Sequence, residues 1–280
     1  MELRPLESSD LEDAPPWVAD RTLRPDLWRD EHTRSVAARD EFGELVAVGI
    51  IWTSRVHGDR YWIDVAVHPD RRRRSIGTGV VRHLRGLRAS PLAFMSRGFV
   101  DDPALAFADA LGARTIQVVP PIEVSTSARL RLRADAATVA GSALSPDAIE
   151  RANAAIYEWT HAAWSPVGPN FAVALNEDLW DELDLEATSV VTDEAGEVLA
   201  MSLVYCDSDP LIITSETVDP HEPEGERLVE VCVRRSLDVL AGRGQSRVEF
   251  DGHVTDPHFM PVLARLAPAG RWFRLVEMPA

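Results

Sequence analysis

The stretch from Asp64 to Val81 constrains this chain more than any other. An apolar run ends at Pro69, four consecutive arginines follow at 71–74, and Gly77 and Gly79 open a segment whose apolar residues recur at helical spacing. Glycines let a backbone approach a ligand closely, and the free N–H groups of a helix start attract anions. Arginines add charge-assisted contacts to phosphate oxygens. The order strand, basic loop and helix therefore predicts a site for a diphosphate-bearing ligand.

The composition limits which classes of partner the chain can bind. The chain has 280 residues and a formal net charge of −16, so the arginine run opposes an acidic background. Proteins that bind nucleic acid are usually basic, which argues against such a partner. An acidic surface attracts a small cationic amine, although acidity also simply promotes solubility. The length exceeds one modest core and favours two domains.

Several classes of protein are disfavoured by simple counts. No apolar stretch is long enough for a membrane span, and the N-terminal residues lack the pattern of a secretory signal. With only Cys206 and Cys232, we expect a cytoplasmic protein without disulfides, and two buried cysteines acting as small hydrophobes. Neither cysteine has metal-ligand spacing, so no metal is expected. A monomer and a homodimer both remain open.

The first half of the chain alternates strands and helices after an antiparallel hairpin. A short strand at 1–6 comes first. The predicted elements that follow are strands at 35–39, 45–52 and 60–68, a helix at 78–88, a strand at 91–96, a helix at 103–111 and a strand at 114–119.

The second half repeats this order in elements but not in residues. We predict strands at 129–133, 187–192, 198–206, 211–218, 247–250 and 272–277, and helices at 145–164, 226–240 and 259–266. The junction after the strand at 211–218 keeps a proline and Gly225, but Glu222, Glu224 and Glu226 replace the arginines. The fold class is therefore α+β with mixed sheets, in two tandem domains at 1–124 and 125–280.

The hexapeptide Arg74-Ser75-Ile76-Gly77-Thr78-Gly79 fits the pattern Arg/Gln-x-x-Gly-x-Gly/Ala. It follows a strand end in which Val67 stands two residues before Pro69, and it opens an amphipathic helix. In this context it resembles the acyl-CoA signature of the GNAT N-acetyltransferase superfamily, and the likeness covers residues 1–122. The resemblance implies two GNAT-like acyl-CoA N-acyltransferase domains, the second degenerate, with acetyl-CoA between the splayed strands at 60–68 and 91–96.

The resemblance also assigns roles to residues of this junction. Backbone groups at Val65, Ala66 and Val67 are expected to pair with the pantetheine arm of acetyl-CoA. The expected diphosphate donors are the N–H groups of Ser75, Ile76, Gly77, Thr78, Gly79 and Val80. Arg74 fills the basic position of the family, and Arg72 and Arg73, with Arg71, are candidates for the adenosine 3′-phosphate.

Acyl transfer from a thioester to an amine needs a proton acceptor, an oxyanion donor and a proton for the thiolate. Asp64 is the possible general base, and the N–H of Val65 or Val67 is the expected oxyanion donor. The usual family acid is a tyrosine on the helix at 103–111, but Phe107 or Ala108 stands in its place. Ser96 or a water molecule could substitute.

The leading hypothesis is an acetyl-CoA-dependent N-acetyltransferase for a small, cationic amine, with the cofactor on the N-terminal domain. The alternative is a non-catalytic acyl-CoA-binding or scaffold protein. A strand-to-helix turn with solvated arginines, a dinucleotide site and an interaction protein without cofactor fit less well. The second domain is expected to bind CoA poorly, and either to line a substrate cleft through Glu216, Asp251 and His253 or to be architectural.

Overall fold

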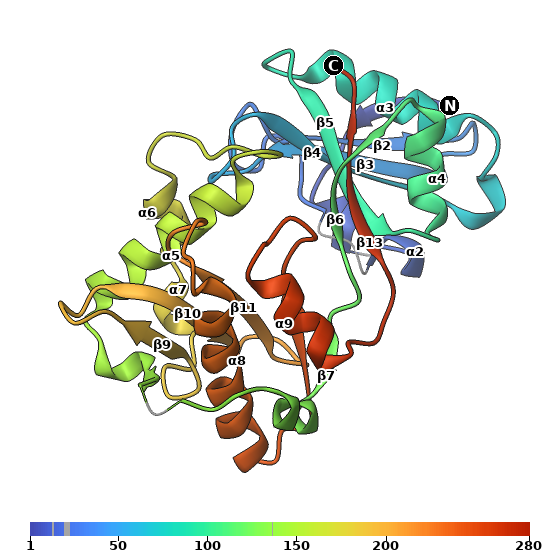
Figure 1. The fold of residues 1–280 in the computed structure, drawn as a ribbon. Coiled ribbons are helices and arrows are strands. Elements are labelled where there is room, and N and C mark those ends of the chain that lie inside the picture. Colours follow the sequence, from blue (N-terminus) through green and yellow to red (C-terminus); the bar gives the residue numbers. More distant parts are fainter. Residues whose placement is uncertain (13, 20–22, 136) are drawn as a thin grey trace. The chain divides into compact units, whose positions relative to one another are not determined.

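A computed structural model describes residues 1–12, 14–19, 23–135 and 137–280 of the chain. The chain divides into two compact units (Figure 1). Unit 1 comprises Met1–Thr115 and Leu275–Ala280, and unit 2 comprises Ile116–Arg274. Each unit contains a mixed sheet packed against helices, so the α+β class with mixed sheets predicted from the sequence is confirmed.

The first sheet has seven strands in the order β1-β2-β3-β4-β5-β13-β6. Its strands are β1 (Glu2–Pro5), β2 (Arg34–Arg39), β3 (Leu45–Thr53), β4 (Arg60–Val67), β5 (Ala93–Phe99), β6 (Arg114–Val119) and β13 (Phe273–Met278). Strands β1 to β4 pair in antiparallel fashion, and β4 pairs with β5 in parallel. The connection from β4 to β5 therefore crosses over through a helix, α3 (Ile76–Leu87).

Two cores lie on opposite faces of this sheet. On one face α3 and α4 (Pro103–Ala110) bury Val80, Leu84 and Leu105 against odd-numbered positions of β4, such as Ile63. On the other face α1 (Ser9–Glu12) and α2 (Pro16–Ala19) lie near a smaller core that includes Val18 and Ala66. The two faces of β4 thus belong to different layers, as strand alternation requires.

The second sheet has six strands in the order β7-β12-β11-β10-β9-β8. Its strands are β7 (Glu123–Ser125), β8 (Val139–Ala140), β9 (Ser189–Thr192), β10 (Val198–Tyr205), β11 (Ile212–Thr217) and β12 (Arg247–Asp251). The helices of this half are α5 (Pro146–His161), α6 (Phe171–Leu175), α7 (Leu179–Glu182), α8 (Gly225–Gly242) and α9 (Phe259–Leu266). Helices α8 and α9 cover one face, and α5 and α7 contribute to a separate core.

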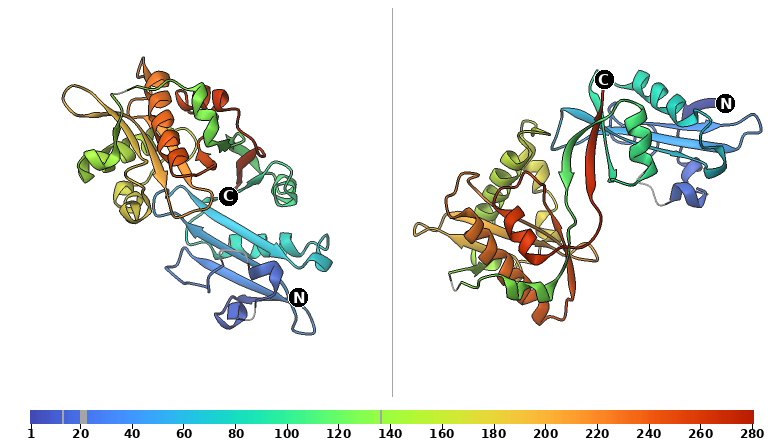
Figure 2. Two further views of the ribbon diagram at one scale, coloured as in Figure 1. Left: turned by 90° about the horizontal axis from the view of Figure 1, so that it is seen from below. Right: turned by 45° about the vertical axis from the view of Figure 1, so that its right-hand side comes forward.

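The last strand does not stay with its own half of the chain. The sequence assigned 272–277 to the C-terminal domain, but β13 lies between β5 and β6 in the first sheet (Figures 1 and 2). In exchange, β7, which follows β6 directly, pairs with β12 in the second sheet. The two units consequently divide near residue 115, whereas the sequence placed the boundary at 124.

Two other local predictions were wrong. Residues 129–133 alternate like a strand, but Thr126–Arg131 form a 3₁₀ helix, η2, whose Ala128 enters the core beside α8. Cys232 is buried as predicted and burial raises its pKa, but Cys206 is exposed, and both are free thiols. Two further 3₁₀ turns are η1 (Pro69–Arg71) and η3 (Gly141–Ala143).

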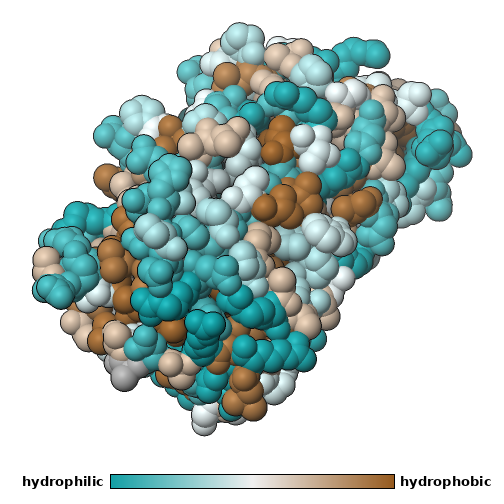
Figure 3. Space-filling view, in the orientation of Figure 1, coloured by the Kyte–Doolittle hydropathy of each residue, from teal (hydrophilic) through white to brown (hydrophobic). Residues whose placement is uncertain are grey.

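Hydrophilic residues cover most of the face drawn in Figure 3, and the hydrophobic residues on it form small separate groups. Among the described residues, no helix combines the length and the apolar character that crossing a membrane demands. No cluster of three or more histidine, cysteine, aspartate or glutamate side chains in the described part of the chain has the geometry to hold a metal ion.

An ion-pair cluster fixes β13 in the first sheet. The Glu277 carboxylate accepts hydrogen bonds from Arg60 of β4 at 2.5 Å and from Arg114 of β6 at 2.7 and 2.9 Å. Burial raises the pKa of Glu277, but the hydrogen bonds and charges of the two arginines outweigh it, and the net pKa lies below the usual value. A carboxyl group whose pKa is lowered by folding stabilises the folded state above its unfolded pKa.

We therefore expect Glu277→Gln to lower the free energy of unfolding by about 1–3 kcal/mol at pH 7. The difference from the wild type should shrink as the pH falls below the unfolded value of about 4.3, because the wild-type carboxyl group then becomes neutral. Urea unfolding of both proteins at pH 7 and pH 3 measures this. Glu41→Gln, at an exposed position, is the matched control, and equal stabilities of wild type and Glu277→Gln at pH 7 would contradict the assignment.

Candidate active site

The parallel ladder between β4 and β5 ends early. Its register pairs are Arg60 with Ala93, Tyr61 with Phe94 and Trp62 with Met95, yet β4 continues to Val67 and β5 to Phe99. On its other side β4 remains paired with β3 over its whole length. The strands therefore separate beyond Trp62 and Met95, and we call this opening the unit 1 split.

The alternation of the β3–β4 ladder shows which backbone groups of β4 face the split. The N–H of His68 donates to the Val46 carbonyl at 2.9 Å, so even-numbered residues of β4, including Ala66, direct their backbone groups to β3. Those of Val65 and Val67 point into the split. The Val67 carbonyl accepts a hydrogen bond there from Arg72 Nε at 3.2 Å.

The loop between β4 and α3 has an unusual backbone. Arg73 and Ser75 have positive φ angles of 62° and 61°, and left-handed residues of this kind occur in the backbone nests that bind anions, so we call residues 71–75 the nest. The helix begins at Ile76, and the N–H of Gly79 already donates to the Ser75 carbonyl. Of the six N–H groups predicted to bind the diphosphate, those of Ser75, Ile76, Gly77 and Thr78 therefore have no carbonyl partner within the helix. Val80 lies deeper, with its side chain in the core.

The two glycines of the motif differ in their surroundings. A Cβ on Gly77 would lie 3.2 Å from the Phe107 ring and 3.5 Å from a Val67 methyl group, so α3 packs tightly on β4 and α4 there. A Cβ on Gly79 would meet only Met1, at 3.5 Å. Phe107, which stands near the expected position of the family tyrosine, therefore contacts the start of α3 and carries no acidic proton.

The four arginines of the loop have different partners. Arg71 pairs with Asp40 at 3.0 Å, and Arg72 is engaged by the Val67 carbonyl. Arg73 and Arg74 are exposed, and within the described residues no hydrogen bond or ion pair is recorded for their side chains. A cavity of about 370 Å³ opens beside the loop. Its lining residues are Glu44, Leu45, Val46, His68, Asp70, Arg71 and Arg74.

Asp64 lies on β4 two residues beyond the last β4–β5 pair. Its side chain is half-buried and, by strand alternation, lies on the same face of the sheet as Trp62 and Ala66, away from α3. On that face Trp62 stacks on Trp52 of β3, with ring centroids 6.3 Å apart. The Arg97 guanidinium of β5 lies over the Trp62 ring at 5.3 Å. The sequence did not point to these three side chains, although the alternate spacing of Trp62 and Asp64 on β4 could have indicated Trp62.

Unit 2 contains a second split with the same geometry. Strand β11 pairs with β12 only from Ile212 to Thr214, and then continues to Thr217. Counting from the first register pair, Glu216 corresponds to Asp64 and Thr217 to Val65. The backbone groups that are open in unit 1 have partners here. The N–H of Thr217 donates to Glu216 at 2.9 Å, and its carbonyl accepts the indole N–H of Trp159 at 3.0 Å.

His258 occupies the rest of this second split. Its Nδ1 lies 2.9 Å from Glu216 and 2.8 Å from the hydroxyl of Thr217, and Glu216 also accepts the N–H of Phe259 at 3.2 Å. Burial raises the pKa of Glu216, while these N–H groups and the His258 charge oppose that rise. The ring of His258 rests on the first residue of α8, because a Cβ on Gly225 would lie 2.5 Å from it.

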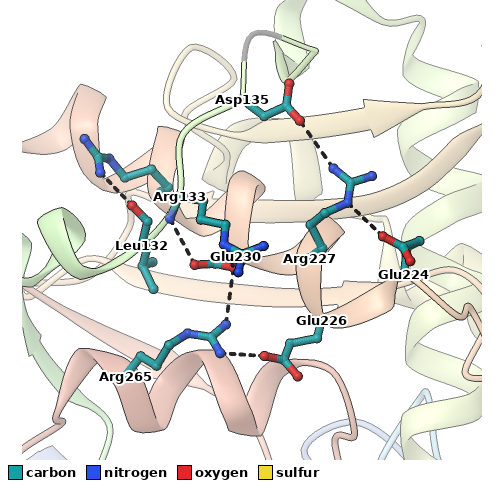
Figure 4. Close-up of polar contacts among 9 residues, drawn as sticks. Leu132, Arg133, Asp135, Glu224, Glu226, Arg227, Glu230 and Arg265 are labelled. Atoms are coloured by element: carbon teal, nitrogen blue, oxygen red, sulfur yellow. Dashed lines mark hydrogen bonds and ion pairs between the residues drawn. The ribbon is translucent and has the colours of Figure 1, made fainter.

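The acidic loop before α8 is neutralised from within the chain (Figure 4). Arg227 pairs with Glu224 at 3.0 Å and with Asp135 at 3.3 Å, and Arg265 pairs with Glu226 at 2.5 Å. Glu230, whose side chain is 7% exposed, accepts the N–H of Arg133 at 2.9 Å and lies 3.5 Å from Arg265. A cavity of about 480 Å³ is lined by these groups. The sequence identified Glu224 and Glu226 but neither Glu230 nor the arginines that face these carboxylates.

The other predicted wall residues of unit 2 lie at the end of β12. The His253 ring packs edge-on against that of His161, with centroids 5.5 Å apart, and lies at a tilt to that of Trp164, with centroids 5.1 Å apart. Burial lowers the pKa of His253, but Asp256, 3.7 Å away, outweighs it and the net pKa is raised. Asp251 is exposed. The packing around His253 is that of a core imidazole.

Comparisons with known proteins agree with this arrangement. Residues 2–94 match the sequence profile of the acetyltransferase (GNAT) family. No curated protein sequence matches the chain. Solved structures share its fold at low identity. A GCN5-related N-acetyltransferase from Sphaerobacter thermophilus has 17% identity and a TM-score of 0.60 over 87% of this chain and 79% of its own.

A tandem GNAT protein from the clavulanic acid biosynthesis pathway has 18% identity and a TM-score of 0.57 over 89% of this chain and 83% of its own. The N-myristoyltransferase of Saccharomyces cerevisiae, solved with bound myristoyl-CoA, has 10% identity and a TM-score of 0.55 over 99% and 82%. At such identities the likeness is one of fold.

The His258 ring leaves no room for a side chain at Gly225, so a methyl group there must displace the ring. We expect Gly225→Ala to lower the free energy of unfolding by about 1–3 kcal/mol, as overpacking does. Gly242→Ala, at the other end of α8 where a Cβ meets nothing within 4 Å, should be neutral or stabilising by up to about 1 kcal/mol. Thermal and urea unfolding measure both, and equal effects of the two substitutions would contradict the packing described for His258.

Proposed function

We propose that the chain is an N-acetyltransferase that uses acetyl-CoA bound by unit 1, because residues 2–94 match the profile of the acetyltransferase (GNAT) family and a tandem GNAT protein shares the fold of the chain. The acceptor in this proposal is a small amine, which the acidic surface attracts. The two free thiols are consistent with activity in the reducing cytoplasm.

One observation carries the proposal. The two units have the same split between parallel strands, but within the described residues only that of unit 1 has backbone groups without a partner facing it and a basic nest directly beyond it. The split suits an extended arm with amide groups, for which Val65 offers a donor and an acceptor and Val67 offers a donor, since Arg72 takes the Val67 carbonyl. The nest with Arg73 and Arg74 suits a diphosphate. In unit 2 the chain's own side chains take both places, so we assign no CoA to it.

The proposed acetyl transfer uses side chains and backbone groups of β4 and β5. Acetyl-CoA supplies the acetyl thioester. Asp64, on the face away from α3, accepts a proton from the acceptor amine directly or through water, which frees the lone pair for attack. The N–H of Val65 or Val67 is placed to stabilise the developing oxyanion. Ser96, on the separated part of β5, or a water molecule returns a proton to the leaving thiolate.

A second candidate function rests on Phe107. Its ring stands near the place where the family resemblance predicts an acidic tyrosine, and it packs on Gly77. A domain that binds acyl-CoA without turnover would need the nest and the split but no proton donor. Thiol release with a panel of amines separates the two functions.

The cofactor site is tested by charge reversal in the nest loop. We expect Arg74→Glu to raise the dissociation constant of acetyl-CoA at least about tenfold, because hydrogen bonds to charged groups contribute about 1.5–3 kcal/mol. Isothermal titration calorimetry measures it. Arg151→Glu makes the same charge change at an exposed position of α5 and should leave the constant within about twofold. Unchanged binding in Arg74→Glu, or no binding in the wild type, would refute the site.

The catalytic role is tested at Asp64. We expect Asp64→Asn to reduce kcat by about 10²–10⁴-fold, the usual contribution of a positioned base, without changing the affinity for acetyl-CoA. Release of the free thiol of CoA reports turnover, and calorimetry reports binding. Undiminished turnover would remove Asp64 from this role. Binding without turnover of any amine in the wild type would favour the non-catalytic function.

A further inference from the structure

The face of the first sheet that carries Asp64 also carries a group that the proposed reaction does not use. Arg97 is exposed on β5, and its guanidinium lies over the ring of Trp62. Within the described residues no ion pair or hydrogen bond is recorded for its side chain. In a chain of net charge −16, a cation held by an aromatic ring but given no carboxylate partner is available to an external anion.

The position of Arg97 relative to Asp64 follows from the ladder. Trp62 and Met95 form the last β4–β5 pair, and Asp64 and Arg97 each lie two residues further along their strands. They therefore stand on opposite sides of the mouth of the split. Parallel neighbours lie about 4.8 Å apart within a ladder, and these two strands diverge, so the backbones at Asp64 and Arg97 are separated by at least about that distance.

Trp62 supplies an apolar surface next to them. Its ring is half-buried, lies at an interplanar angle of 15° to the ring of Trp52, and has the Arg97 guanidinium 5.3 Å from its centroid. A pair of parallel indoles presents a flat apolar surface that favours planar or methylene groups. An ammonium group attracted by Asp64, an apolar spacer on Trp62 and an anionic group at Arg97 together describe one ligand.

We propose that the acceptor is an amine that also bears an anionic group, with Arg97 binding the anion and Trp62 the spacer between the two charges. This inference rests on the proposed acetyl transfer at Asp64 and names its substrate class. Arginine suits a carboxylate or phosphate because its planar fork gives two parallel hydrogen bonds. In this reaction the amine nitrogen bonds to the acetyl carbon and the carbon–sulfur bond breaks. The nitrogen releases one proton, and the thiolate takes up one proton.

The test compares two probes that differ only in the anion. 4-(Aminomethyl)benzoate and benzylamine have the same amine and the same planar ring, but only the first carries a carboxylate. We expect the wild type to show a kcat/KM for the carboxylate probe about 10–100-fold above that for benzylamine, measured by thiol release. Arg97→Ala should abolish this preference, and Arg97→Lys should restore part of it. Trp62→Leu should lower kcat/KM for both probes.

Arg82→Ala is the matched control, because Arg82 is exposed on α3, against the other face of the sheet. It should leave the preference and the dissociation constant of acetyl-CoA unchanged. A wild type that prefers neither probe, or an Arg97→Ala variant that keeps the preference, would overturn the proposal. So would an Arg97→Ala variant that loses affinity for acetyl-CoA to the same extent as for the probe, because Arg97 would then serve the cofactor.

A binding measurement separates this inference from the proposed function. Saturation-transfer NMR detects either probe on the protein without turnover. If the carboxylate probe binds and its binding requires Arg97, the anion subsite is supported. If no thiol is released in that case, only the proposal of acetyl transfer is refuted. If both probes bind equally well to the wild type and to Arg97→Ala, the subsite fails whatever the result with acetyl-CoA.

Discussion

The early end of the ladder between two parallel strands is the constraint on which both units depend. A strand whose neighbour diverges presents N–H and C=O groups without a ladder partner, and such groups are costly to bury unpaired. In unit 2 the chain solves this itself, since Glu216 and Trp159 take both backbone groups of Thr217. In unit 1, within the described residues, only the Arg72 side chain is seen to bond a backbone group of β4 beyond Trp62, the Val67 carbonyl.

Electrostatics separates the two junctions as clearly as backbone geometry does. In unit 1 the loop concentrates arginines, and two of them have no recorded side-chain partner in the described chain. In unit 2 the loop concentrates glutamates, and arginines from other elements approach them, Arg265 from α9 among them. A helix start that is surrounded by satisfied carboxylates has little affinity for a diphosphate, because the ligand would have to displace or oppose those charges.

The sequence was informative where structure is decided locally. Apolar periodicity located most helices and strands, and the run around Gly77 identified the junction that holds the nest. It failed where the partner is remote. Nothing near Glu277 reveals that β13 pairs within the first sheet, and nothing near Gly225 reveals the ring of His258 on it. At 129–133 alternation misled, because a 3₁₀ turn can also bury a residue such as Ala128.

The exchange of strands makes the first sheet depend on residues from the C-terminal end of the chain. Strand β7 follows β6 but completes the second sheet, and β13 follows α9 but lies between β5 and β6 in the first. Arg60 and Arg114 hold β13 through Glu277, so the sheet that bears the split depends on a strand reached only through unit 2. The second junction can lack arginines without removing any strand from the first sheet. The chain that delivers β13 cannot be lost in the same way, because β6 would then lack its neighbour.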